Sequence, residues 1–267
     1  EGLLNTVAAG GFGGIDFQPP SCNGNALVDA EGRFVYVDFQ HFVLGDYSKY
    51  LEKVAGMAAE DSHFGSRRIL GGGRFLYQSI PAVKMAAKRS VESRSTLYSN
   101  LLSAAGVSVR DKVVLDVGCN IGMMIAEYLK WGARWCHGWD FPNVVPHTER
   151  LLLALGCTRF STTGGKLTHD RRLEDDLAPW LRSSLKGCVI SYLAVHGHIG
   201  WIEALSRIPW SFLIYEGHEK DTRDDVMRHL SDLGKVVDFE TKAIHTSEDG
   251  ASTERLAAIL VRRGAAC

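Results

Sequence analysis

Short apolar runs alternate with stretches of helical periodicity through the second half of the chain. Four of these runs predict buried strands, at residues 113–116, 135–140, 188–193 and 211–216. Residues 123–131 and 144–155, which follow the first two runs, place apolar side chains at helical spacing. Two later runs, 236–244 and 256–262, predict a closing antiparallel pair. Strands that alternate with helices predict a mostly parallel sheet with helices on both faces, so we expect an α/β fold.

The N-terminal third follows a different pattern. Strand-like runs at 26–29 and 33–38 flank a turn that contains Gly32, and this arrangement predicts a β-hairpin. Residues 90–105 carry apolar side chains at near-helical spacing, which predicts a helix packed on one face. The expected division is a hairpin appendage at 1–60, a helical cap at 61–110 and the α/β domain at 111–267.

Composition and charge narrow the class of protein. The chain has 267 residues, 45% of them hydrophobic, enough to bury a sizeable core without disulfides or metals. Its 30 basic and 31 acidic residues leave a formal net charge of −1. Neither a nucleic acid nor a membrane is expected as a partner, because both usually need a basic surface. The six cysteines include no CxxC pair and no apolar run is long enough to span a bilayer, so we expect a reducing, cytoplasmic location.

Candidate chemistry is concentrated around the first two predicted strands. The first strand ends in Asp116 and leads into Gly118, Asn120 and Gly122, after which a helix begins. Small residues allow the backbone to approach a ligand closely, and a helix N-terminus presents unpaired N–H groups. The second strand ends in Asp140, at the separation where an acid meets ribose hydroxyls in nucleotide-binding sheets. The pattern therefore predicts a nucleotide-like ligand at the carboxyl ends of these strands.

The segment 116–122, Asp-Val-Gly-Cys-Asn-Ile-Gly, resembles the first motif of class I (Rossmann-like) S-adenosylmethionine-dependent methyltransferases. That motif is usually an acid followed by Gly-x-Gly-x-Gly. Asn120 stands here for the middle glycine, similar to the Gly-Cys-Asn-x-Gly of several methyltransferase branches. A nicotinamide-binding fingerprint would need Gly-x-Gly-x-x-Gly instead. The resemblance covers residues 90–262 and implies S-adenosylmethionine as the cofactor and a mostly parallel sheet whose last strand is antiparallel.

The resemblance also implies roles for individual residues. Asp116 would lie near the methionine amino group, and Asp140 would hold the ribose. Tyr77 and Arg94 would close over the cofactor, with the Arg94 guanidinium on the methionine carboxylate; the alternative is a surface arginine. Asp170, after the expected third strand, would contact the adenine amino group or belong to a solvated loop. The full set of implied cofactor-binding residues is Asp116, Gly118, Cys119, Asn120, Gly122, Asp140, Phe141, Tyr77, Arg94 and Asp170.

Histidines and an acid lie at the carboxyl ends of the next two predicted strands. His196 and His198 come after the run 188–193, in a segment similar to the Leu-x-His that ends this strand in related families. Either histidine could take a proton from an acceptor hydroxyl, and a structural histidine at the turn is the alternative. Glu216 ends the following strand, with His218 close behind. We expect both to contact the acceptor rather than a metal, because no further ligand with recognisable spacing completes a metal site.

A second, shorter resemblance lies near the N-terminus. Asn25 and the segment Asp38-Phe39-Gln40, with the hairpin between them, resemble the end of the catalytic loop and the metal-binding Asp-Phe-Gly of kinase-like phosphotransferases. Gln40 replaces the glycine, and no recognisable nucleotide-binding loop or strand lysine precedes the segment, so no ATP site is expected within this chain. The resemblance implies a remnant of a kinase-like domain, fused or partnered upstream. The alternative is a β-hairpin that extends the cap.

The predicted function is transfer of a methyl group from S-adenosylmethionine to an oxygen or nitrogen of a small-molecule or glycan acceptor. An in-line displacement at the reactive sulfonium needs mainly the alignment of donor and acceptor. Two alternatives stay open. One is a kinase-associated or regulatory module that binds a nucleotide without methyl transfer, and the other is a structural partner domain without a ligand.

Overall fold

The computed structural model describes residues 78–83, 87, 89–248 and 254–264, together with four short strands nearer the N-terminus. Those strands are β1 (Ile15–Asp16), β2 (Ala26–Val28), β3 (Phe34–Tyr36) and β4 (Val43–Leu44). The antiparallel pairing of β2 with β3 confirms the predicted hairpin, and β1 pairs with β4, which the sequence pattern does not indicate. Asn25, Asp38 and Tyr77 lie outside the described residues. The predicted domain boundaries and the kinase-like remnant therefore stay predictions.

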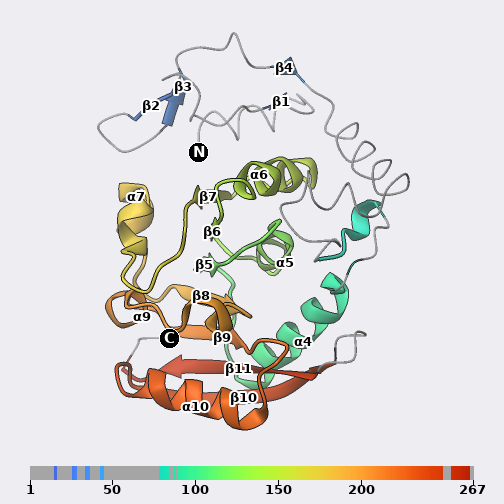
Figure 1. Ribbon diagram of the computed structural model, residues 1–267. Helices are drawn as coiled ribbons and strands as arrows, with labels where there is room; N and C mark the ends of the chain where they lie inside the picture. The colour runs from blue at the N-terminus through green and yellow to red at the C-terminus, as the bar shows by residue number, and fades with distance from the viewer. Residues whose placement is uncertain are drawn as a thin grey trace.

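A seven-stranded sheet organises the described part of the chain (Figure 1). Its strand order is β10 (Phe239–Glu248), β11 (Glu254–Arg262), β9 (Phe212–Glu216), β8 (Val189–Leu193), β5 (Val113–Val117), β6 (Trp135–Asp140) and β7 (Phe160–Gly164). β11 runs antiparallel to both of its neighbours, and the other pairings are parallel. This order, with the last strand antiparallel, confirms the predicted Rossmann-like α/β sheet. β5 pairs with β6 on one side and with β8 on the other, so the strand order reverses there.

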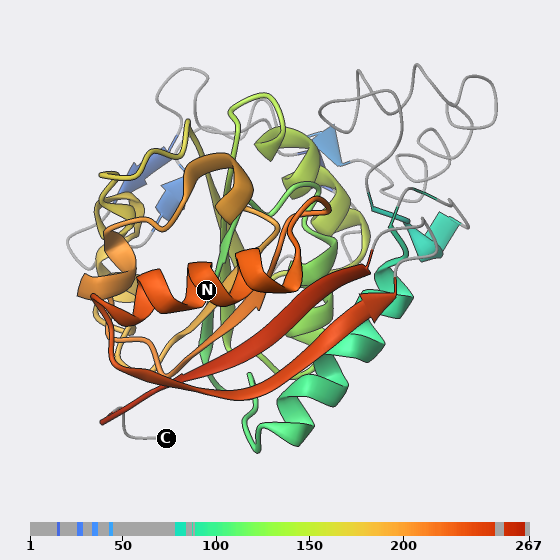
Figure 2. The ribbon, with the colours of Figure 1, turned by 60° about the horizontal axis from the view of Figure 1, so that its bottom comes forward.

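Helices connect the strands and cover both faces of the sheet. In chain order they are η1 (Pro81–Val83), α4 (Val91–Ala104), α5 (Met123–Lys130), α6 (Val145–Ala154), η2 (Leu173–Asp176), α7 (Pro179–Arg182), α8 (His196–Ile199), α9 (Ala204–Arg207) and α10 (Arg223–Gly234). Figures 1 and 2 show α4, α5 and α6 on one face, and α7, α9 and α10 on the other. Ser90 caps α4 by accepting a hydrogen bond from the Ser93 N–H, and Thr222 forms a capping box with Asp225 at the start of α10. Both of these helices therefore begin where a side-chain oxygen satisfies a backbone N–H.

Two hydrophobic cores lie on the two faces of the sheet. Side chains alternate along each strand, so Val114 of β5 packs with α4 and α5, whereas its neighbour Leu115 packs with α7, α9 and α10. The central strands are buried along nearly their whole length, as expected of parallel strands covered on both faces. Asp116, Ser191 and Glu216 interrupt the apolar face beneath α4 and α5. The sheet thus carries a polar layer on one face, near the carboxyl ends of β5, β8 and β9.

The secondary structure differs from the predicted elements in detail. β10 begins at Phe239 rather than at 236, and β11 begins at Glu254 rather than at 256. The short helices α7, α8 and α9 have four residues each, too few to produce a helical periodicity in the sequence. No helix among the described residues is both long and apolar enough to cross a membrane.

Candidate functional site

The loop between β5 and α5 turns tightly against the end of β6. Gly118, Asn120 and Gly122 have positive φ angles of 77°, 50° and 79°. Glycine adopts this region without strain, and asparagine tolerates it better than most residues do. The backbone N–H of Asn120 donates to Asp140 Oδ2, and the N–H of Phe141 donates to Asp140 Oδ1, both at 2.7 Å. The structure therefore brings the glycine turn and the second acid of the predicted site into direct contact.

Close packing explains why both ends of this turn are glycine. A Cβ atom at Gly118 would lie 2.7 Å from Val195 Cγ2, and one at Gly122 would lie 2.8 Å from Thr148 Cγ2. Val195 belongs to the segment after β8, so Gly118 lets the loops after β5 and β8 approach each other where the strand order reverses. Thr148 also holds the turn, because its Oγ1 donates to the carbonyl oxygen of Asn120 at 2.6 Å.

Asp116 lies beneath the turn, with only 2% of the residue exposed. Ser191 Oγ donates to Asp116 Oδ1 at 2.6 Å, and Tyr128 Oη lies 2.9 Å from Ser191 Oγ. Burial raises the pKa of Asp116 to about 6, against the opposing effects of the Ser191 hydrogen bond and the Arg94 charge. The carboxyl group therefore titrates close to neutral pH, and small changes around it decide its charge.

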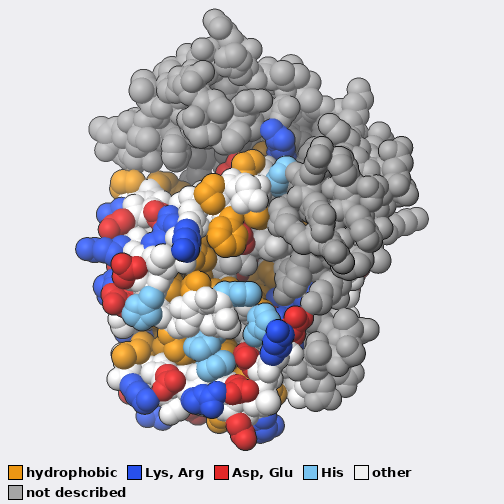
Figure 3. All heavy atoms as spheres, viewed as in Figure 1, with side chains coloured by type: hydrophobic (Ala, Val, Ile, Leu, Met, Phe, Trp, Pro, Cys, Tyr) orange, Lys and Arg blue, Asp and Glu red, His pale blue; other side chains and the backbone are white. Residues whose placement is uncertain are grey.

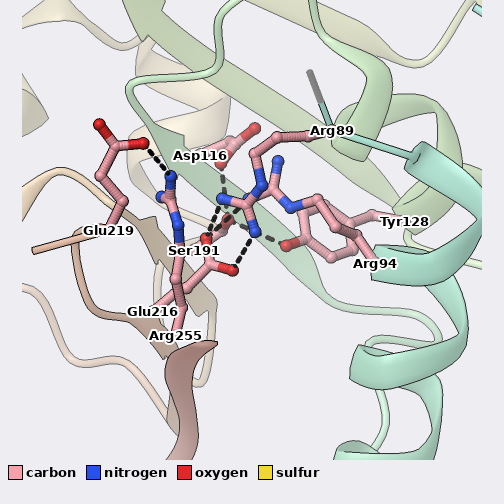
Figure 4. A network of polar contacts seen from close by, with 8 residues as sticks. All are labelled: Arg89, Arg94, Asp116, Tyr128, Ser191, Glu216, Glu219 and Arg255. Atoms are coloured by element: carbon pink, nitrogen blue, oxygen red, sulfur yellow. Dashed lines mark hydrogen bonds and ion pairs between the residues drawn. The ribbon is translucent and has the colours of Figure 1, made fainter. Parts of the chain in front are cut away.

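Arginines and glutamates form a buried network between α4 and the ends of β9 and β11 (Figure 4). Glu216 is fully buried and accepts hydrogen bonds from Arg89 Nη1 at 2.9 Å and Arg89 Nη2 at 2.6 Å. Arg94 Nη2 donates to the same carboxylate at 3.1 Å, and Arg255 pairs with Glu219 at 3.3 Å. Burial alone would raise the pKa of Glu216, but the charges of Arg94 and Arg89 hold it at about 2. Glu216 is therefore ionised and committed to partners from the chain segment that precedes the sheet.

These contacts bear on two of the predicted roles. Arg94 is buried, and its guanidinium lies 5.8 Å from the centre of the Tyr98 ring, so the alternative of a surface arginine is wrong. The sequence left this alternative open because periodicity does not reveal that this position of α4 faces a carboxylate on the sheet. The cofactor contact of Arg94 and the acceptor contact of Glu216 stay predictions.

Histidine side chains gather over the region of β8, β9 and α10 (Figure 3). The His196 ring stacks on the ring of His229 with their centroids 3.7 Å apart, and it meets Trp201 edge-on at 4.8 Å. His229 comes from α10, and its Nδ1 lies 2.9 Å from Tyr215 Oη. Burial, with the neighbouring His229, lowers the pKa of His196 to about 4. The His196 ring is therefore neutral at pH 7.

His198 and His218 form a second pair closer to solvent. Their rings meet edge to face with centroids 5.1 Å apart, and His198 is exposed. Burial, and then the proximity of His198 and the charge of Arg255, lower the pKa of His218. In the described ranges, no three His, Cys, Asp or Glu side chains are placed to hold a metal ion. The catalytic role of either histidine pair and the acceptor contact of His218 stay predictions.

The remaining predicted residues lie at different depths. Phe141 is 58% exposed at the end of β6, and Cys119 is buried next to Gly138. Burial raises the pKa of the Cys119 thiol, so this side chain packs as a small apolar group. Asp170 is exposed in the loop after β7.

Several residues of the site are not marked by the sequence pattern. A polar residue within the apolar run 188–193 could have indicated Ser191, because a buried hydroxyl needs a hydrogen-bond partner. No comparable signal marks Tyr128, Arg89 or His229, since each meets its partner only after the chain has folded.

Comparison with known proteins gives likenesses of fold. A scan against protein-family models and a search of curated proteins find no match to this chain. The magnesium protoporphyrin IX methyltransferase (ChlM) of Synechocystis PCC 6803, solved with bound SAM, is 15% identical with a TM-score of 0.46, over 82% of this chain and 98% of that chain. The methyltransferase domain of bacterial-CtHen1-CN is 12% identical with a TM-score of 0.48, over 64% of this chain and 98% of that chain. A protein named as a hemolysin from Streptococcus thermophilus is 15% identical with a TM-score of 0.47, over 64% of this chain and 66% of that chain. With identities and TM-scores this low, these likenesses support no conclusion about function.

Proposed function

We propose that this protein is an S-adenosylmethionine-dependent methyltransferase that acts on an oxygen or nitrogen of a small-molecule or glycan acceptor. The observation that carries the proposal is the contact between the glycine turn and Asp140, at the point where the strand order reverses. Ligands of open α/β sheets bind outside the carboxyl ends of the strands at such a point. The motif of Asp116, the turn and Asp140 is the one that resembles methyltransferases in sequence.

The residues at this edge fit the parts of the cofactor. Each carboxylate oxygen of Asp140 accepts one backbone N–H, and each has a second acceptor position for a ribose hydroxyl. Phe141 offers an exposed apolar face next to that carboxylate, suited to the adenine ring. Asp116 places a second carboxylate beneath the turn, where the methionine ammonium group would be received.

The proposed methyl transfer requires mainly that the protein align the donor with the acceptor. When bound, S-adenosylmethionine would supply an electrophilic methyl group. The chain's own groups would hold donor and acceptor in line. His196 is neutral at pH 7 and could accept a proton from an acceptor hydroxyl, and the exposed His198 is the second candidate base.

Isothermal titration of the purified chain with S-adenosylmethionine, and separately with Mg-ATP, tests the cofactor. Micromolar affinity for S-adenosylmethionine alone is the expected result. Affinity for Mg-ATP alone would instead favour the kinase-associated nucleotide-binding module, and would overturn the proposal.

Asp140→Ala tests the site itself. Loss of charge-assisted hydrogen bonds to the ribose should weaken cofactor binding about tenfold to a hundredfold while the fold is retained. Asp238→Ala, which removes an exposed carboxylate paired with Arg263, is the matched control and should bind as the wild type does. Unchanged affinity in Asp140→Ala would remove this edge of the sheet from cofactor binding.

His196→Ala tests the acceptor side. If His196 takes the proton from an acceptor hydroxyl, methyl transfer from labelled cofactor should slow about a hundredfold while the dissociation constant of the cofactor stays the same. His198→Ala, measured in parallel, assigns the base to one residue of the two. Full transfer in both variants would exclude these histidines from catalysis.

A further inference from the structure

A buried series of three side chains links α5, β8 and β5 beneath the glycine turn (Figure 4). Tyr128 Oη, Ser191 Oγ and Asp116 Oδ1 follow one another at 2.9 Å and 2.6 Å. Tyr128 and Ser191 are completely buried, so their hydroxyl groups meet partners inside the protein rather than in solvent. The proposed function uses Asp116 and assigns no role to either hydroxyl.

The direction of the protons along this series follows from what each group can donate. An ionised Asp116 only accepts, so Ser191 donates its single proton to that carboxylate. Ser191 Oγ must then accept the hydrogen bond that joins it to Tyr128. Burial keeps the pKa of Tyr128 well above its usual value, so Tyr128 is a neutral donor. Every proton in the series therefore points toward Asp116, which favours and orients its carboxylate form.

Other groups face Asp116 from the elements packed around it. The Arg94 guanidinium of α4 favours the carboxylate, whereas the Asp140 carboxylate of β6 disfavours it. The thiols of Cys119 and Cys136 also lie nearby, and burial raises the pKa of both, so they are uncharged at neutral pH. Ser191 thus acts together with one cation against burial and a second anion.

We propose that Ser191 and Tyr128 are positioning residues for cofactor binding, because they hold Asp116 as an oriented carboxylate for the methionine ammonium group. This inference rests on the proposed function. A neutral Asp116 could not pair with the ammonium group through charge, so the hydroxyls set the lower pH limit at which the site binds. A merely structural role for the two hydroxyls would instead weaken binding equally at every pH.

The test compares Ser191→Ala and Tyr128→Phe with the wild type in two measurements. The first follows the Asp116 carboxyl carbon by NMR across pH in the absence of cofactor, with Asp116→Asn to assign the signal. Loss of a hydrogen bond to a charged group should raise the pKa of Asp116 by about one unit in Ser191→Ala, and by less in Tyr128→Phe. The second measures the dissociation constant of S-adenosylmethionine at pH 6 and pH 8.5.

The expected result is a pH-dependent loss of affinity. Ser191→Ala should bind S-adenosylmethionine about fivefold more weakly at pH 6, because a one-unit rise lowers the ionised fraction of Asp116 from about one half to about one tenth. At pH 8.5, where the carboxyl group is ionised in both proteins, its affinity should lie within about twofold of the wild type. Ser211→Ala is the matched control, because Ser211 is also a buried serine at a strand of the sheet, but its hydroxyl donates to the carbonyl oxygens of Gly187 and Cys188. It should match the wild type at both pH values.

The two measurements distinguish a wrong positioning role from a wrong proposed function. An unchanged pKa of Asp116 in Ser191→Ala, or an equal loss of affinity at both pH values, would overturn the positioning role. A wild-type chain that does not bind S-adenosylmethionine at either pH would overturn the proposed function. In that case the NMR titration would still decide whether the two hydroxyls set the charge of Asp116.

Discussion

The turn after β5 and the polar layer beneath it are held together by different kinds of contact. In the turn, side chains bind main-chain atoms: Asp140 accepts two backbone N–H groups, and Thr148 donates to a carbonyl oxygen. In the layer, side chains bind side chains across the fold. Ser191 reaches Asp116 from the neighbouring strand, and Arg89 reaches Glu216 over a separation of 127 residues.

The two kinds of contact make the two regions sensitive to different substitutions. Contacts to backbone depend on the path of the chain, so the turn responds most to changes in φ angle and in the space around each glycine. Contacts between buried charges depend on the identity of both partners, because a buried charge that loses its partner is strongly destabilising. We therefore expect the loss of a buried ion-pair partner in the layer to act mainly on stability, and substitutions in the turn to act mainly on ligand affinity.

Glu216→Ala should show the sensitivity of the layer most strongly. The variant removes a buried carboxylate that accepts hydrogen bonds from Arg89 and Arg94. Removing one partner of a buried ion pair destabilises a protein by about 3–5 kcal/mol. Urea unfolding at pH 7, followed by circular dichroism, would record this loss as a lower midpoint.

A control at the surface separates burial from charge in that experiment. Glu240 also pairs with a cation, Lys242, but on an exposed part of β10, so Glu240→Ala should leave the midpoint unchanged. The pKa of Glu216 falls from 4.5 to about 2 on folding, so its contribution is present above pH 4.5 and is lost as the pH falls toward 2. Equal midpoints for Glu216→Ala and the wild type would contradict the stabilising role assigned to this pair.

Asp116→Asn should separate stability from binding within the layer. Folding raises the pKa of Asp116 from 3.8 to about 6, so the folded state favours the protonated form. That contribution to stability is present below pH 3.8 and is lost as the pH rises through 6. Asparagine keeps a neutral side chain at every pH, so the variant should be about 2–3 kcal/mol more stable than the wild type at pH 8.

The same variant should bind S-adenosylmethionine at least about tenfold more weakly, since it lacks the charge that would meet the ammonium group. Urea unfolding at pH 4 and pH 8, with cofactor titration at pH 8, measures both effects. The gain in stability should shrink toward pH 4. A gain of the same size at both pH values would show that burial of the charge is not its cause.

The sheet and the turn could be predicted because short, continuous stretches of the sequence mark them. Strands buried on both faces are apolar runs, and the run at 113–116 leads directly into the acid and glycines of the turn. Asp140 follows at the end of the next strand, so the contact between Asp140 and Asn120 joins residues that are close in sequence. The hairpin of β2 and β3 has the same local character, because the two short runs that pair lie close together in the sequence.

The layer and the histidine pairs could not be predicted, because their partners meet only in the folded chain. The sequence places His196 after β8, but it does not show that the ring stacks on His229 of α10. Arg89 precedes a predicted helix without any periodicity that marks it as the partner of Glu216. Pairings of this kind depend on the order of strands in the sheet, which brings β9 beneath the start of α4.

Among these variants Gly118→Ala should have the smallest effect on stability, and it tests the turn rather than the polar layer. Alanine in the left-handed region costs about 1–2 kcal/mol, and a Cβ at this position would also lie 2.7 Å from Val195 Cγ2. Gly156→Ala is the matched control: its φ angle of 76° imposes the same strain, yet nothing lies within 4 Å of the added atom. Urea unfolding should show a somewhat larger loss for Gly118→Ala, and cofactor titration should show weaker binding for that variant alone. Equal losses with equal affinities would mean that Val195 moves aside freely and that the turns after β5 and β8 act independently in binding.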